Sequence, residues 1–262
     1  MFLRRAARSI EVAAMLVRRE LVADFEVSRM SLLWPIGYPL AYTLLVVFMR
    51  PVFGGGFIGS HAEFGMYVFV GFCIWHSWFE VLRRQMDAVK ANKSLVTRAE
   101  IGSSTLFLIT LFYTGAQLVL RLVFATLFAV FLLKSGAWAI IGFVAFALVA
   151  LLNGAVIGAL LQPFSTLSPD FGKGIQSISL GLLITGAVFF RLPAEQPPTL
   201  VAIVGINPMG ALLNLARAPL FGEAPVAPLA SYVWIAVTFL LLAVVLLLGR
   251  RVMPILIERI GN

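Results

Sequence analysis

The feature that most constrains this chain is a series of long stretches without a charged residue. A helix needs about 20 apolar residues to cross the roughly 30 Å hydrocarbon core of a bilayer. Such stretches predict spans at 30–49, 64–79, 137–161, 174–190 and 231–249, and a further span within 101–133, which is interrupted only by Arg121. We therefore predict an all-α integral membrane protein with six transmembrane helices per protomer.

Composition supports a membrane protein and excludes several other classes. Apolar residues make up 61% of the 262 residues and charged residues only 12%, against about 25% charged residues in soluble domains. A soluble globule of this size needs more polar surface than that, so a soluble enzyme, a disordered chain and a fibre are excluded. With Cys73 as the single cysteine and only two histidines, we predict no disulfide framework and no metal site.

One further uncharged stretch, residues 196–216, is long enough to cross a membrane but is interrupted. It contains Pro197, Pro198 and Pro208, together with Gly205 and Gly210. Proline removes a backbone donor and breaks a continuous helix. We predict a re-entrant or interfacial hairpin of short helices between spans five and six.

The distribution of positive charge supports six spans rather than seven. The formal net charge is +8, and Lys and Arg concentrate on the cytoplasmic side of membrane proteins. With six spans and both termini in the cytoplasm, most of the 20 Lys and Arg lie inside. A seventh span would move Arg250, Arg251 and Arg259 outside. The positive-inside bias accounts for the basic balance better than nucleic-acid binding does, so we expect no nucleic-acid partner.

The N-terminal segment predicts an amphipathic helix rather than a cleavable signal. Ile10, Val17 and Phe25 belong to one apolar stripe, while Arg8 and Arg19 lie away from it. Such a helix lies in the cytoplasmic interface with its cations toward anionic headgroups. The chain is predicted to be one permease domain, 1–262. It consists of an interface helix at 1–29, a six-span core at 30–250 and a cytoplasmic tail at 251–262.

Motifs for independent catalysis are absent from the sequence. It contains no phosphate loop of the form G-x-x-x-x-G-K-[ST], no H-E-x-x-H and no G-x-S-x-G. We therefore predict that the chain is not an enzyme and holds no nucleotide of its own. A channel, a carrier or a subunit driven by a separate motor remains.

The order of several short motifs resembles the permease subunits of type-2 ABC exporters, specifically the family that exports capsular polysaccharide and lipopolysaccharide O-antigen. The resemblance covers nearly the whole chain. The motifs on which it depends are Val17-Arg18-Arg19-Glu20-Leu21, Leu33-Trp34-Pro35, Val70-Gly71-Phe72, Ala91-Asn92-Lys93-Ser94-Leu95-Val96, and Ile206-Asn207-Pro208-Met209 followed by Arg217 and Gly222. The chain departs from the family at Met30-Ser31-Leu32, where the family commonly has a Leu-Gly pair before the Trp.

The resemblance implies a homodimer in the bacterial inner membrane that works with two separate ABC ATPase subunits. ATP and Mg would be bound by those subunits, and the cargo would be a polysaccharide or glycolipid. Periplasmic or outer-membrane export proteins are further expected partners. The ATPase subunits would dock on the segment between spans two and three, at Arg83, Arg84, Val89, Asn92, Lys93, Leu95 and Val96. The alternative interpretation of the charges alone is an ordinary positive-inside loop.

Aromatic residues mark a candidate substrate path. Trp34, Tyr38 and Tyr42 recur every four residues and share one helix face. A second group, in predicted span two, comprises Phe72, Trp75 and Trp78. Aromatic faces suit a sliding glycan, since they stack on sugar C–H surfaces. An interfacial aromatic belt or helix packing explains the same residues.

Three polar features complete the candidate sites. Arg121 lies in predicted span three, where a charge marks a functional site; alternatively it snorkels to the outer interface. Asn207 is expected to cap a helix that Pro208 begins, which with Arg217 would close the outer mouth of the path or form a structural plug. His76 and Glu80 are one turn apart and form either a gating pair or a structural contact.

Three other functions compete with polysaccharide export. The first is a type-2 exporter for another cargo, namely a teichoic-acid polymer, a drug or a lipid. An ion- or proton-coupled carrier predicts acids inside the spans, and the predicted span interiors contain none. A membrane-embedded transferase predicts an acidic or nucleophilic cluster, and the sequence shows none.

Overall fold

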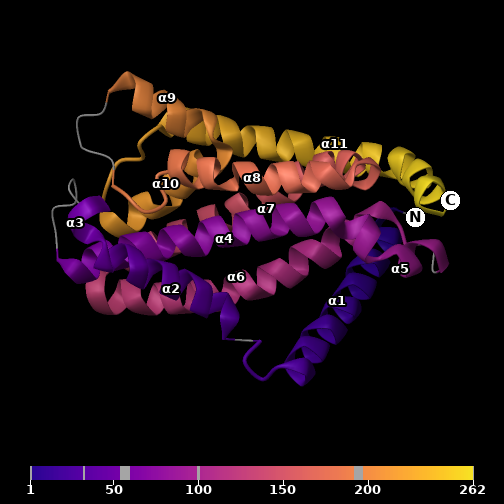
Figure 1. Cartoon of the computed structure of the whole chain (residues 1–262), viewed down its shortest axis with the longest axis horizontal. Coiled ribbons are helices and arrows are strands. Elements are labelled where there is room, and N and C mark those ends of the chain that lie inside the picture. The colour runs from indigo at the N-terminus through magenta and orange to yellow at the C-terminus, as the bar shows by residue number, and fades with distance from the viewer. Residues whose placement is uncertain (1, 32, 54–59, 99–100, 192–196, 262) are drawn as a thin grey trace.

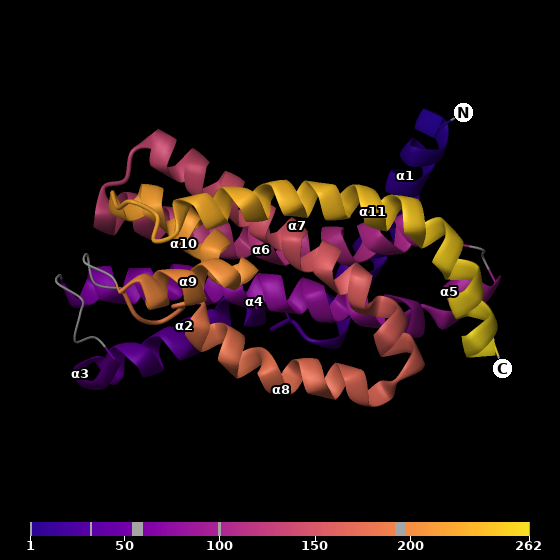
Figure 2. The same cartoon turned by 90° about the horizontal axis from the view of Figure 1, so that it is seen from above.

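A computed structural model describes residues 2–31, 33–53, 60–98, 101–191 and 197–261, and α-helix is the only regular secondary structure in these ranges. The helices are α1 (Phe2–Val27), α2 (Trp34–Phe48), α3 (Arg50–Phe53), α4 (His61–Ala91), α5 (Lys93–Arg98), α6 (Ser103–Leu133), α7 (Ala137–Leu167), α8 (Pro169–Thr185), α9 (Pro198–Ile206), α10 (Pro208–Phe221) and α11 (Pro228–Gly261). Figures 1 and 2 show α2, α4, α6, α7, α8 and α11 running along the long axis. The two chain ends lie at the same end of the molecule.

The protein is a multi-pass membrane protein. Four of its described helices are long and apolar enough to cross a bilayer: α4, α6, α7 and α11 over Pro228–Gly249. These four coincide with predicted spans two, three, four and six. The predicted break within 196–216 is confirmed, because α9 and α10 meet at a bend of 105° and count together as at most one further span. α2 and α8, with 15 and 17 residues, are shorter than these four.

α4 is the central helix and is longer than the sequence predicted. It begins with a capping box, in which Ser60 Oγ accepts from the Glu63 backbone N–H at 3.1 Å and Glu63 Oε2 accepts from the Ser60 N–H at 3.0 Å. Residue 79 is the end of the uncharged stretch predicted as a span, and the helix continues beyond it. Val81, Leu82 and Val89 continue a buried stripe at helical spacing, so the helix runs on to Ala91.

α4 and α7 pack closely because α7 carries two glycines four residues apart. A Cβ at Gly154 would lie 2.6 Å from the Trp78 carbonyl oxygen, and one at Gly158 would lie 2.5 Å from the Leu82 carbonyl oxygen. Small residues at this spacing let membrane helices approach each other. Asn153, next to Gly154, fixes the contact through its side chain, which accepts from Trp78 Nε1 at 3.0 Å.

A second apolar cluster lies at the end of the molecule where the chain ends lie. It joins α1, α5 and the adjacent ends of α4, α6 and α11 through Ala13, Val17, Val89, Val96, Leu106, Ile109, Tyr113, Met253 and Leu256. α1 therefore packs on protein through Ala13 and Val17. Ile10 and Phe25, from the predicted apolar stripe, stay exposed.

Candidate functional site

Arg121 is a buried cation in the interior of α6, and its side chain is only 1% exposed. All three guanidinium nitrogens donate to protein groups from two other helices. Nε donates to the Pro35 carbonyl at 2.8 Å, Nη1 donates to Ser77 Oγ at 2.7 Å, and Nη2 contacts Glu80 Oε2 at 3.1 Å. This arrangement differs from a side chain that snorkels to the outer interface, because every polar group of Arg121 is satisfied inside the protein.

Glu80 extends this contact toward α1. Its other oxygen, Oε1, lies 3.9 Å from Arg84 Nε, and Arg84 Nη1 lies 3.0 Å from Glu20 Oε1 on α1. The Arg84 guanidinium also stacks over the Tyr113 ring at 3.6 Å from the centroid, and Tyr113 donates to Asp24 at 2.5 Å. Charged and polar groups thus form a continuous chain from α1 to the start of α2, which we call the Arg121 chain.

His76 does not pair with Glu80, although the two are one helical turn apart. Its imidazole packs at 5.9 Å from the Tyr38 ring and 6.3 Å from the Trp75 ring. Glu80 has Arg84 and Arg121 as its partners. The shortest ion pair of Glu80 at this end of predicted span two therefore joins α4 to Arg121 of α6, and His76 takes no part in it.

The aromatic residues of the predicted path fall into two environments. Trp34, Tyr38 and Tyr42 on α2 are 53%, 47% and 49% exposed, and we call them the α2 ladder. Tyr42 stacks on Phe72 at 5.4 Å, and Trp34 stacks on Tyr38 at 5.1 Å.

The remaining members belong to α4. Trp75 is half-buried and stacks on Phe79 at 5.6 Å. Phe72 is buried beneath the ladder. Trp78 is 2% exposed and faces α7, so it is a core residue and contributes no accessible surface to a path.

The predicted docking residues lie on the last turns of α4 and on α5, and they also divide by burial. Arg83 and Lys93 are exposed, whereas Arg84, Asn92 and Leu95 are half-buried. Val89 and Val96 are buried in the second apolar cluster and hold the segment against α1 and α11.

A pocket of about 560 Å³ opens between this segment and α1. Among its lining side chains are Arg19, Glu20, Arg83, Arg84, Asp87 and Leu95. The end of the molecule that carries both chain termini therefore presents a charged hollow with apolar side chains in its wall.

The side chains of the predicted outer hairpin bind the C-terminal end of α8. Asn207 caps α10 as predicted, accepting from the Gly210 backbone N–H at 3.2 Å, and Pro208 is the first residue of that helix. The Asn207 amide nitrogen also donates to the Leu182 carbonyl at 2.9 Å. The Leu182 carbonyl also accepts from the Gly186 backbone N–H at 2.9 Å, so Asn207 adds a second donor at the C-terminal end of α8 and ties the start of α10 to it.

Arg217, the third hairpin residue, is buried and donates to the carbonyls of Ala187, at 2.8 Å, and Val188. Its guanidinium stacks over the Tyr67 ring of α4 at 4.0 Å. Room for it comes from Gly71, because a Cβ there would overlap both Arg217 Nη2 and the Val188 carbonyl oxygen. Gly71, Tyr67 and Arg217 therefore lock α4, α10 and the end of α8 together.

A surface ion pair lies close to this lock. Arg191, which follows α8, pairs with Glu223, which follows α10. Partial burial raises the pKa of Glu223 above its usual range, and the neighbouring Arg191 and Arg217 act in the opposite direction.

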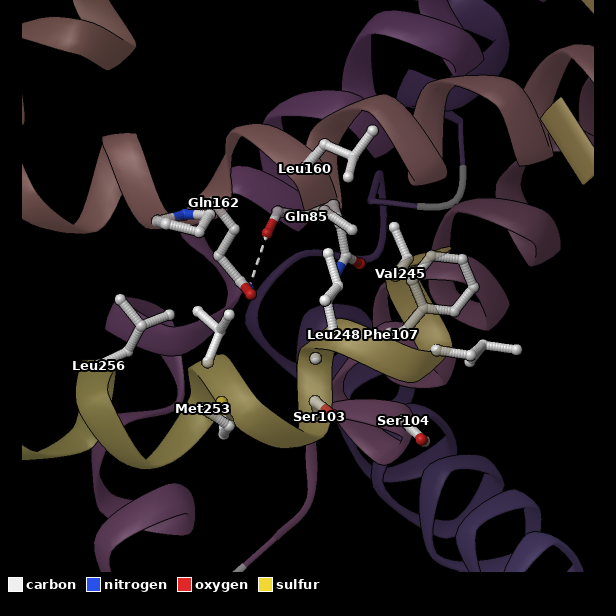
Figure 3. A pocket seen from close by; sticks show the side chains of 15 residues that line it. Gln85, Ser103, Ser104, Phe107, Leu160, Gln162, Val245, Leu248, Met253 and Leu256 are labelled. Atoms are coloured by element: carbon white, nitrogen blue, oxygen red, sulfur yellow. Dashed lines mark hydrogen bonds between the residues drawn. The ribbon is translucent and has the colours of Figure 1, made fainter. Parts of the chain in front are cut away.

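A small pocket of about 140 Å³ lies among α4, α6, α7 and α11, as Figure 3 shows. Its two glutamines are already engaged, since Gln162 donates to the Gln85 backbone carbonyl at 3.1 Å and the Gln85 side chain accepts from Thr110. The remaining wall is mainly apolar. Across the described residues, no group of three His, Cys, Asp or Glu side chains is placed to hold a metal ion.

Several residues that build these contacts are absent from the sequence predictions, although three of them carry a local signal. The Gly154-x-x-x-Gly158 spacing marks close helix packing. Pro39 inside α2 implies an unpaired carbonyl four residues earlier, where Arg121 binds. Glu80, 41 residues before Arg121, carries no local signal as its partner, because contacts between helices depend on their packing.

Comparison with known proteins adds no family. No protein-family model matches the chain, and a search of the curated proteins also finds no match.

Proposed function

We propose that this chain is the membrane-spanning subunit of an ATP-driven exporter of the type-2 ABC class. It moves a lipid-linked polysaccharide such as capsule or O-antigen across the bacterial inner membrane. Two copies form the conduit, each with six spans and both termini in the cytoplasm. Two separate ABC ATPase subunits supply the energy, and this chain holds no ATPase site.

The observation that carries the proposal is the α2 ladder. The first and last of its three aromatic side chains are eight positions apart, about 12 Å along the helix axis, and each is about half exposed. An interfacial belt gathers aromatics at the ends of spans, whereas this ladder follows the helix. Continuous aromatic faces suit a polymer that slides, because they stack on sugar rings without requiring one pattern of hydroxyl groups.

α8 supports a conduit made by two copies. In Figure 1, α8 and α2 lie on opposite sides of α4. In Figure 2, the view turned by 90°, both helices lie on the same side of α4. Gln176 and Ser177 are exposed on α8. Polar side chains at membrane depth require water or another protein surface, so a second copy or a wet path next to α2 and α8 accounts for them.

The charged hollow between α1 and the α4–α5 segment supports docking of a soluble subunit. Its cations and acids offer complementary contacts to a partner of mixed charge, and Leu95 adds an apolar anchor. The hollow lies at the end that carries both termini and the basic residues of α4, α5 and α11. The positive-inside bias makes that end cytoplasmic.

Co-purification tests the proposal directly. We would tag the chain, extract it from native membranes in mild detergent and identify bound ABC ATPase subunits by mass spectrometry. The variant Arg83→Glu with Leu95→Asp alters the hollow without touching the apolar cluster. We expect it to lose most of the ATPase subunit. The control is Lys134→Glu, a charge reversal at the C-cap of α6, the end of that helix remote from the second apolar cluster, and we expect it to retain the subunit.

Two results would count against the proposal. Absence of any ABC ATPase from the wild-type preparation contradicts an ATP-driven exporter. Equal recovery with both variants contradicts the docking position. If the ATPase binds and the exported material is teichoic acid, a drug or a lipid, the exporter class stands and the polysaccharide assignment is wrong.

A further inference from the structure

α2 has an internal defect in its hydrogen bonding. Pro39 lies inside the helix and has no backbone N–H, so it cannot donate to the carbonyl of Pro35 four residues earlier. Both prolines are on the buried side of α2. A carbonyl left without a donor inside a membrane protein is costly, because no water is available to replace the bond.

Arg121 supplies the missing donor. Its Nε–H donates to the Pro35 carbonyl at 2.8 Å, which replaces the bond that Pro39 cannot make. The same guanidinium is held on its other side by Ser77 and Glu80 of α4. The position of α2 at its proline is therefore tied to α4 and α6 through one side chain.

The Arg121 chain continues from this point to α1. Glu80 faces Arg84, and Arg84 pairs with Glu20 beside the charged hollow. Both Glu20 and Arg84 line that hollow. The start of α2, which carries the α2 ladder, is thus connected by consecutive polar contacts to the surface where we place the ATPase subunit.

We propose that Arg121 is a positioning residue that closes the proline gap of α2 and couples the orientation of the α2 ladder to the docking end. The first part, the hydrogen bond from Arg121 to the Pro35 carbonyl that closes the gap, rests on the geometry alone. The coupling rests on the proposed function, because it assigns the docking end to an ATPase subunit. A simpler role for Arg121, neutralising Glu80, predicts no special relation to Pro39.

A proline replacement separates the two roles. In Pro39→Ala the new backbone N–H can donate to the Pro35 carbonyl, so α2 no longer needs Arg121. Arg121→Met with Glu80→Gln removes both charges and the donor without leaving a buried carboxylate. The matched control is Pro35→Ala, which also converts a proline of α2 but lies in the first turn, where a helix N–H has no partner within the helix.

Hydrogen–deuterium exchange of α2 in lipid nanodiscs is the measurement. We expect Arg121→Met with Glu80→Gln to speed exchange of the α2 amides about tenfold, because the helix loses the stabilisation of one charge-assisted hydrogen bond. Adding Pro39→Ala should restore most of the protection, and adding Pro35→Ala should not. If the double variant does not accumulate, recovery of folded protein by Pro39→Ala and not by Pro35→Ala is the equivalent result.

Unchanged exchange in the double variant would overturn the proposal, as would equal rescue by the two proline replacements. Export and ATPase binding are scored separately on the same variants. Loss of α2 protection with rescue by Pro39→Ala, in a protein that binds no ABC ATPase, would keep the closed gap and reject both the coupling and the proposed function. Normal ATP-linked export in the double variant, despite loss of α2 protection, would reject the coupling alone.

Discussion

Individual aromatic residues in this protein differ mainly in what surrounds their rings. Trp78 is buried between α4 and α7, and its indole N–H is bound by Asn153. Trp34 stands on the exposed face of α2, with its ring stacked on Tyr38. The sequence places both in the same candidate path because period and residue type do not report which face of a helix is covered.

We expect the two tryptophans to respond differently to substitution. Trp78→Phe removes a buried donor and leaves the Asn153 oxygen without it, which costs about 1–3 kcal/mol. Thermal unfolding in detergent should show a fall of several degrees. Trp34→Phe should leave the unfolding temperature unchanged, and Trp34→Ala should lower export without loss of folded protein. Equal destabilisation by both changes to Phe would contradict the assignment.

Gly71 gives a second test at the residue scale. Its missing Cβ makes room for Arg217 and the Val188 carbonyl, so Gly71→Ala should destabilise the lock by about 1–3 kcal/mol or more. Gly65→Ala on the same helix is the control, since its Cβ would meet Val47 at an ordinary 3.5 Å. Thermal unfolding of both variants checks the difference, and a Gly71→Ala protein as stable as the control would refute the lock.

The positions of helices can be predicted from the sequence where a charged residue or a proline marks where a helix or a span ends. The spans over α4, α6, α7 and α11 and the break at Asn207-Pro208 follow from such local signals. The end of α4 does not, because charges at Glu80 and Arg83 end an apolar span but do not end a helix.

The packing of the elements is less accessible from the sequence. α1 has apolar residues on more than one side, and contact with α6 selects Ala13 and Val17 for burial. Arg121 is unusual on sequence grounds alone, yet its partners come from α2 and α4. Such contacts follow from the relative positions of helices, which no local pattern specifies.

The α4–α7 contact gives a prediction at the element scale. Gly154→Ala and Gly158→Ala should each weaken it by about 1–3 kcal/mol, because the added methyl group would meet backbone carbonyls of α4 at 2.6 and 2.5 Å. Gly115→Ala on α6 is the control, with its nearest atom, Leu151 Cδ2, at 3.8 Å. Thermal unfolding should separate the first two from the control, and three equal values would mean that the close approach is unimportant.

At the scale of the whole molecule, the fold separates two regions. One is a membrane core around α4 and α7, with the α2 ladder exposed on one side. The other is the second apolar cluster, which holds α1, α5 and the charged hollow together. The Arg121 chain joins the two, so a change at the hollow has a physical route to α2.

The central claim, that this chain is a conduit driven by a separate ATPase, is tested most directly by reconstitution. Purified chain would be placed in proteoliposomes with lipid-linked polysaccharide, with and without the ABC ATPase subunit that co-purifies with it. We predict translocation only when the ATPase subunit and Mg-ATP are both present, and none from an ion gradient. Translocation by the chain alone, or driven by a proton or sodium gradient, would contradict the account.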